Sequence, residues 1–280
     1  MRAALAVGRD GTINNRAHEQ GDIMTSRIHI RHALELIYLL IRKDLKVRYK
    51  SSVLGYLWTL ANPFAFGFVY WVAFKLIMRV EMENYSLFLL SAMFPWLWLS
   101  AGVTQATSVY RNNASLVKKV NLHRAILPLS VILQEMVNFI FAIPVLIAFF
   151  YFTAKIIHPS WLWQVPLMLT VQLIFAFPVA LTLAIWNVFV HDIEYLIGIA
   201  FSLLFFATPI VYPTTMIPAE YRGYFEASPL HALVQSWRSI FFSGTLDFAS
   251  IGYCLVVGAV CSVIAAFVFA RLAHKIGEFL

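Results

Sequence analysis

The sequence predicts an all-α membrane protein with six transmembrane helices, on the basis of its composition, its long apolar runs and the placement of its charges. Hydrophobic residues make up 61% of the 280 residues and charged residues 12%, whereas soluble domains contain about 45–50% and about 25%. Six runs lack Asp, Glu, Lys and Arg, and five of them exceed the roughly 20 residues that a helix needs to cross the hydrocarbon core. The run 136–154 reaches that length with its apolar lead-in, 125–134. Because the runs are apolar on all sides rather than alternating, helices are favoured over barrel strands.

Charge placement predicts the orientation. With the amino terminus inside, the cytoplasmic parts are 1–50, 109–124, 191–194 and 271–280, and they contain 16 of the 21 Lys and Arg residues. This bias follows the positive-inside rule, so we expect both termini in the cytoplasm. The first 25 residues are polar and lack the apolar core of a secretory signal. The orientation also explains most of the net charge of +7, and no nucleic-acid partner is expected.

The amino-terminal region precedes the first span. We expect residues 1–25 to form a polar cytoplasmic tail, and residues 26–55 to comprise an amphipathic helix in the membrane plane and the loop that follows it. Apolar residues recur every three or four positions from Ile30 to Leu45, and five of the nine residues 42–50 are basic. This pattern fits an anchor for lipid headgroups or a docking surface for a cytoplasmic partner.

The transmembrane region is predicted over residues 56–280. Its spans are expected at about 56–78, 85–108, 126–152, 162–189, 193–212 and 248–270. The cytoplasmic segment 109–124 is longer than the usual 2–8 residues of a helix connection, which suggests a second docking role. The segment 213–244 interrupts the hydrophobic pattern and is expected to form two short re-entrant helices. Such backbone is tolerated only where it is buried in protein or lines a cavity, so we expect a pore mouth on the outer side.

Three polar or aromatic features have alternative interpretations. Glu135 lies at membrane depth, where a proton or ion site is the default reading, but a hydrogen bond to Asn138, Gln134 or a neighbouring helix is favoured. The cluster from His191 to Glu194 could bind a metal, yet a tight polar turn fits better because no second ligand pair is visible. Trp96 and Trp98 lie deeper than an interfacial belt, where their rings can pack in the core or contact the C–H face of a sugar.

Several catalytic motifs are absent from the sequence. It contains no Gly-Lys dipeptide, so it cannot be a P-loop ATPase by itself. It also lacks the nucleophile elbow of hydrolases, the His-Glu-x-x-His zinc motif and a cysteine cluster. Asp192 and Glu194 offer a pair of carboxylates that a membrane-embedded glycosyltransferase could use, although two acids in one turn are a weak signal. We therefore expect no catalytic residue, no metal site and no cofactor in this chain.

Four stretches carry a resemblance to a known family. They are 42–63, 118–130, 208–213 and 228–230. Together with six spans, they resemble the membrane subunit of type 2 ABC exporters of lipid-linked polysaccharides, such as O-antigen, teichoic acid and capsule, over about residues 30–280. Ser228 stands where the family commonly has Asn, and His123 where Pro often precedes the Arg.

The resemblance implies an assembly and a set of site residues. It implies a homodimer with two copies of a cytoplasmic ABC ATPase, which would bind ATP and Mg²⁺, in a bacterial cytoplasmic membrane. The implied gate loop is Leu54, Gly55 and Tyr56. The implied ATPase interface, which includes a coupling helix, is Arg42, Lys43, Asp44, Lys46, Arg48, Arg111, Asn112, Leu116, Lys118 and Lys119. The expected substrate channel is Phe64, Phe68, Trp71, Trp96, Trp98, Phe205 and Phe206. The expected periplasmic gate is Thr208, Pro209, Tyr212, Pro213 and Pro229.

The expected function is therefore ATP-driven export of a lipid-linked polysaccharide, with O-antigen as the first candidate cargo. A type 2 exporter of a small lipid or drug is the alternative within transport. A membrane-embedded glycosyltransferase is the alternative from another class.

Overall fold

The protein is described here from a computed structural model. The structure describes residues 34–43, 45–46, 84–120 and 122–280, together with 58, 61, 64–65, 68–69, 71–77, 79 and 82. These residues form helices and connections without a strand. The predicted all-α class is therefore confirmed for the part of the chain that is described. The expected gate loop, and Asp44 and Arg48 of the expected ATPase interface, lie outside it.

Among the described residues, four helical segments are long and apolar enough to cross a membrane. Three are α3 (Tyr85–Thr107), α6 (Ile126–Ala154) and α7 (Trp161–Phe189), and the fourth, Phe248–Phe279, comprises α11 (Phe248–Leu272), η3 (Ala273–Lys275) and α12 (Ile276–Phe279). They match four of the six predicted spans. The predicted span 56–78 falls largely outside the described residues, which include only the π-helix η1 (Val72–Ile77) as a continuous element there.

The region of the fifth predicted span contains a shorter helix. Helix α8 (Ile193–Ala207) ends before residue 212, the predicted end of the span. Thr208 takes an extended conformation with φ −98° and ψ 135°. A residue that precedes proline is pushed out of the helical region by contact with the proline ring, and Pro209 follows directly. Beyond it come η2 (Thr214–Met216), α9 (Ala219–Glu226) and α10 (Pro229–Ser243).

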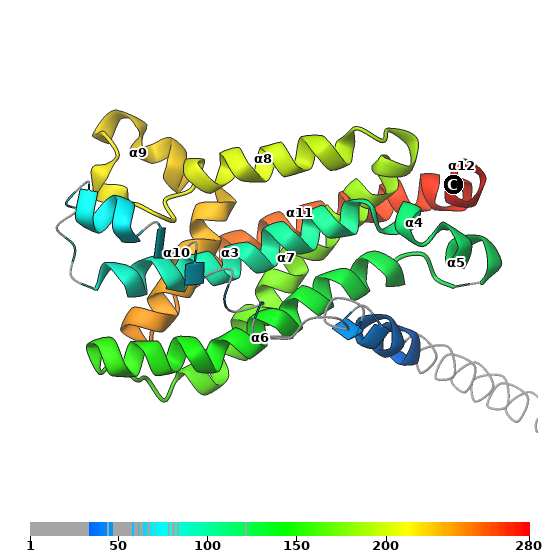
Figure 1. The fold of residues 1–280 in the computed structure, drawn as a ribbon. Coiled ribbons are helices and arrows are strands. Elements are labelled where there is room, and N and C mark those ends of the chain that lie inside the picture. Colours follow the sequence, from blue (N-terminus) through cyan, green and yellow to red (C-terminus); the bar gives the residue numbers. More distant parts are fainter. Residues whose placement is uncertain are drawn as a thin grey trace, which may run out of the picture.

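Helices α3 and α7 lie at the centre of the bundle, with α6 and α11 packed against them (Figure 1). Aromatic rings fill the core between these helices. Phe139 of α6 stacks on Trp98 at 5.8 Å between ring centroids and meets Trp237 of α10 edge-on at 5.1 Å. Gly258 of α11 allows the close approach to α7, because a Cβ there would lie 3.3 Å from the Ile174 carbonyl oxygen.

Short helices gather at one end of the bundle. The helices α4 (Val109–Asn112) and α5 (Ala114–Lys119) lie beside α12 and the carboxyl terminus, opposite the end that holds α9 (Figure 1). Helix α12 is anchored by Ile276, which is fully buried, and by the ring of Phe279, which meets Phe189 of α7 at 4.9 Å. The last residues of the chain are therefore part of the folded bundle.

The connection between α6 and α7 is fastened to the end of α10. The Gly244 carbonyl oxygen accepts hydrogen bonds from Ser160 Oγ at 3.0 Å and Gln164 Nε2 at 2.7 Å. Trp161 Nε1 donates to the Ile240 carbonyl at 2.7 Å. Gly244 ends α10 in the left-handed conformation, with φ 62°, which favours glycine. The His158 ring packs against Gly244.

Candidate functional site

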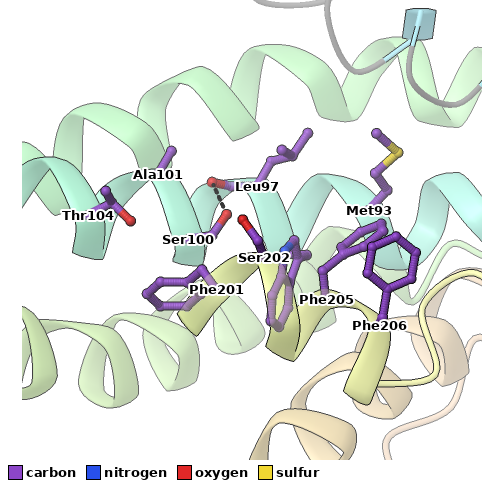
Figure 2. Close-up of a pocket in the computed structure, with 10 residues that line it drawn as sticks. Met93, Leu97, Ser100, Ala101, Thr104, Phe201, Ser202, Phe205 and Phe206 are labelled. Carbon is purple, nitrogen blue, oxygen red and sulfur yellow. Dashed lines mark hydrogen bonds between the residues drawn. The ribbon is translucent and has the colours of Figure 1, made fainter. Parts of the chain in front are cut away.

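A cavity of about 430 Å³ lies between α3 and α8 (Figure 2). Its walls are aromatic and apolar, with three hydroxyl groups among them. The aromatic residues are Trp96 of α3 and Phe201, Phe205 and Phe206 of α8. The hydroxyls belong to Ser100, Thr104 and Ser202, and Met93, Leu97 and Ala101 complete the lining.

The rings of this cavity form a connected group. Trp96 meets Phe201 edge-on at 5.8 Å and Phe205 at 6.0 Å, and Phe205 meets Phe206 at 5.2 Å. Ser202 Oγ donates to the Gly198 carbonyl of its own helix at 2.9 Å, which leaves the hydroxyl oxygen able to accept a bond from a ligand. Ring faces beside hydroxyl groups suit a molecule that presents both C–H surfaces and hydroxyls.

Part of this lining was missed by the sequence prediction, which named only Trp96, Phe205 and Phe206. The missed residues share a helical spacing that could have identified them. Ser100 and Thr104 follow Trp96 at intervals of four on α3, and Phe201 precedes Phe205 by four on α8. Residues four apart lie on one face of a helix.

A second cavity, of about 340 Å³, holds the other aromatic residues of the expected channel. Phe64, Phe68 and Trp71 line it with Ser86, Leu89 and Leu90 of α3 and Phe149 of α6. Phe64 packs edge-on against Phe94 at 5.6 Å, and Phe68 stacks on Trp71 at 6.1 Å. Six of the seven expected channel residues are thus divided between two cavities that lie against α3.

Trp98 lies in neither cavity. Its side chain is 2% exposed, stacks on Phe139, and donates from Nε1 to the Ile132 carbonyl at 3.1 Å. The structure therefore places Trp98 in the core between α3 and α6.

The segment 208–213, part of the expected periplasmic gate, is held by side chains from two helices. Arg238 of α10 donates from Nη1 to the Pro209 carbonyl at 2.6 Å and from Nη2 to the Ile210 carbonyl at 2.7 Å. Tyr85 at the start of α3 donates to the Val211 carbonyl at 2.7 Å.

The other gate residues surround this segment. Thr208 is buried, and Tyr212 donates its hydroxyl to the Phe206 carbonyl at 2.6 Å. Pro213 precedes η2, and Pro229 opens α10 at its first position, where its missing N–H costs nothing.

The described part of the expected ATPase interface is largely exposed, and one of its arginines forms an ion pair within the chain. Arg42, Lys43 and Lys46 are exposed, as are Asn112, Lys118 and Lys119, whereas Leu116 is half-buried. Arg111 Nη1 lies 3.2 Å from Glu194 Oε2. This ion pair joins α4 to the first turn of α8.

The polar turn between α7 and α8 is confirmed. His191 and Asp192 form the turn, and Asn187 Oδ1 accepts a hydrogen bond from the Glu194 backbone N–H at 3.2 Å. Nearby, Tyr110 of α4 donates its hydroxyl to the Arg124 carbonyl at 3.0 Å, and burial raises the pKa of this hydroxyl. Arg111 therefore joins α4 to the start of α8 through Glu194, and Tyr110 joins α4 to the segment before α6.

The favoured interpretation of Glu135 is also confirmed. Glu135 is buried and accepts hydrogen bonds from Asn138 Nδ2 at 3.0 Å and from Gln105 Nε2 of the neighbouring α3 at 2.9 Å. Amide donors from two helices thus satisfy the carboxylate.

A family model described as ABC-2 type transporter matches residues 35–242, well over half of the chain. The chain belongs to the ABC-2 type transporter family. Two relatives, both the O-antigen export system permease protein RfbA of Klebsiella pneumoniae, are 35% identical over 254 residues, covering 91% of this chain and 98% of each relative. A protein with the same description from Myxococcus xanthus is 31% identical over 217 residues, covering 75% of this chain and 82% of the relative.

Membership of the ABC-2 family confirms the resemblance noted in the sequence. It makes the chain a multi-pass membrane permease of a family that implies an ABC ATPase as partner. The cavity between α3 and α8 is therefore a cavity in the membrane part of a transporter.

Proposed function

We propose that this ABC-2 chain is the transmembrane subunit of an ATP-driven exporter that moves a lipid-linked O-antigen polysaccharide across the bacterial cytoplasmic membrane. The observation that carries the proposal is the cavity between α3 and α8, where Trp96, Phe201 and Phe205 stand beside Ser100, Thr104 and Ser202. Aromatic faces suit the C–H surfaces of sugars, and hydroxyls suit their polar edges. The relatives described as O-antigen export permeases support the same cargo.

The proposed assembly contains two copies of this chain and two ATPase subunits, which bind ATP and Mg²⁺. Each chain crosses the membrane six times, with both termini in the cytoplasm. The 15 residues of α8 span only about 22 Å at 1.5 Å per residue, less than the roughly 30 Å of hydrocarbon. The segment 208–213 completes this crossing, and α9 and α10 enter and leave the outer leaflet.

In this orientation α4, α5 and α12 face the cytoplasm. The exposed Lys118 and Lys119 at the end of α5 then face the ATPase, together with Arg42, Lys43 and Lys46. Movement of α4 is transmitted to α8 through the pair of Arg111 and Glu194. Because Phe201 and Phe205 lie on α8, the cavity changes shape when that helix moves. The loop 54–56 remains the proposed cytoplasmic gate.

Gene deletion tests the cargo directly. Loss of the chain should remove polysaccharide from the cell surface and leave it in the cytoplasm, and the purified permease should carry an ABC ATPase with it. Surface polysaccharide that persists in the deletion strain would rule out this cargo. A permease purified under native conditions without any ATPase would rule out the assembly.

A pair of tryptophan variants tests the cavity. Trp96→Leu should slow polysaccharide export because it removes the ring at the centre of the aromatic group, while the complex with the ATPase still assembles. Trp186→Leu is the matched control, since Trp186 is an exposed residue of α7 and lies outside both cavities. Equal export by the two variants would show that the cavity does not contact the cargo.

The second cavity favours one alternative, export of a small lipid or drug. Its lining is almost entirely apolar, with Ser86 as the polar member. This alternative predicts that the deletion strain keeps its surface polysaccharide and loses efflux of the small apolar compound.

A further inference from the structure

The guanidinium of Arg238 is buried among apolar side chains at the end of α3 where Tyr85 lies. It is 6% exposed and lies 3.6 Å from the centroid of the Phe88 ring. Among the described residues no carboxylate forms an ion pair with it, and its hydrogen bonds go to two backbone carbonyls, those of Pro209 and Ile210. Burying a charge costs free energy, so a buried arginine without a carboxylate partner must be stabilised by other contacts.

The segment between α8 and η2 supplies these contacts. Residues 209–211 are not helical, so their carbonyls have no partners from a helix. Inside a membrane protein each such carbonyl must find a donor. Arg238 satisfies the first two and Tyr85 the third, so side chains from α10 and α3 hold three consecutive carbonyls.

This segment also forms the support of the aromatic cavity. Ile210 and Val211 are fully buried and pack in one cluster with Met93 and Trp96, which line the cavity. The Tyr212 hydroxyl is bonded to the carbonyl of Phe206, another lining residue. The position of the segment therefore determines the shape of the cavity at the Met93 and Phe206 end (Figure 2).

We propose that Arg238 is a positioning residue that acts as a latch: it holds the segment 208–213 in the closed position and must release the Pro209 and Ile210 carbonyls when the outer end of the pathway opens. This inference rests on the proposed transport function, which places that end at the outer membrane face. Because the latch consists of carbonyl bonds and a contact with Phe88, it can open without separating an ion pair. Tyr85 acts with it on the Val211 carbonyl.

Two variants weaken the latch in different ways. Arg238→Lys keeps the charge but cannot reproduce the planar pair of donors, so the bonds to the two carbonyls are weakened. Tyr85→Phe removes one hydroxyl and leaves the ring in place. Losing one buried hydrogen bond should increase the open population about tenfold. Arg222→Lys is the matched control, because half-buried Arg222 of α9 donates to the Ile217 carbonyl, outside the segment.

The readout is leakage of carboxyfluorescein from proteoliposomes that contain the permease with its ATPase, without nucleotide and without polysaccharide. We expect faster leakage with Arg238→Lys and Tyr85→Phe than with the wild type or Arg222→Lys, at unchanged assembly with the ATPase. Wild-type leakage in both latch variants, or equal leakage in Arg222→Lys, would overturn the proposal. If Arg238→Lys fails to assemble, the leakage measured with Tyr85→Phe tests the proposal by itself. Since no polysaccharide is present, an error in the proposed cargo leaves this result unaffected.

Discussion

Replacement of Gly244 by alanine is expected to destabilise the protein strongly, because two separate costs meet at this residue. Gly244 has φ 62°, and a residue with a Cβ pays roughly 1–2 kcal/mol in the left-handed region. The new Cβ would also lie 2.5 Å from His158 Cγ and 2.8 Å from His158 Cβ and Nδ1. Overpacking of this kind costs about 1–3 kcal/mol.

The His158 ring cannot move away without loss. Its Nε2 is hydrogen-bonded to the Phe242 carbonyl at 3.1 Å, and the ring meets Trp161 edge-on at 5.7 Å. We therefore expect Gly244→Ala to lower the free energy of unfolding by about 3 kcal/mol in total. The corresponding fall in the apparent midpoint of thermal unfolding is roughly 6–12 °C.

The assay is the fraction of detergent-solubilised protein that remains monodisperse after heating. A double-mutant cycle with His158→Ala isolates the cost of the ring contacts, since the left-handed strain and the contact with the Cβ of residue 158 remain once the ring is gone. Gly198→Ala on α8 is the control, because its Cβ would meet nothing within 4 Å and alanine favours a helix. A midpoint for Gly244→Ala equal to that of Gly198→Ala would refute this reasoning. An equal loss in the His158→Ala background would refute the part assigned to the ring contacts.

Three further predictions concern polar groups. Arg111→Glu and Glu194→Arg should each reduce polysaccharide export per ATP hydrolysed, and the double exchange should restore it; failure of the restoration would exclude a direct role for the ion pair. Glu135→Gln replaces one carboxylate oxygen with a donor, which should cost about 1–3 kcal/mol of stability, while the pH profile of export stays that of the wild type; a shifted profile would instead indicate proton coupling. Asp247 caps α11 through Ser250, whose hydroxyl lowers the Asp247 pKa. Asp247→Ala should therefore cost about 1 kcal/mol at neutral pH, and the difference should vanish in thermal unfolding as the pH falls through the lowered pKa, below the ordinary value of about 3.9.

The sequence predicted the long helices well because an apolar run of about 20 residues has few alternatives in a membrane protein. The bounds of α3, α6 and α7 lie within a few residues of the predicted spans. The end of α8 was predicted wrongly because the apolar sequence continues beyond Ala207, whereas the helical conformation of the backbone ends there. There the steric demand of Pro209 on Thr208 determines the structure.

The site was only partly predictable, and the two tryptophans of α3 show why. Trp96 and Trp98 share a depth, a residue type and nearly the same neighbours in sequence. Two residues along a helix correspond to about 200° of rotation, so the two rings point to different sides. One side meets α8 and lines the cavity, and the other meets α6 and enters the core. Only the arrangement of α6 and α8 around α3 distinguishes a lining ring from a packing ring. The role of Arg238 has the same origin, because the carbonyls it binds lie about 30 residues away in the sequence.

The anchoring of α12 has a practical consequence for purification. Ile276 is enclosed, Phe279 packs on α7, and α12 contacts α5. An affinity tag fused after α12 would emerge beside α5, next to the surface that we assign to the ATPase. A tag in this position is therefore expected to weaken the co-purification of the permease with its ATPase.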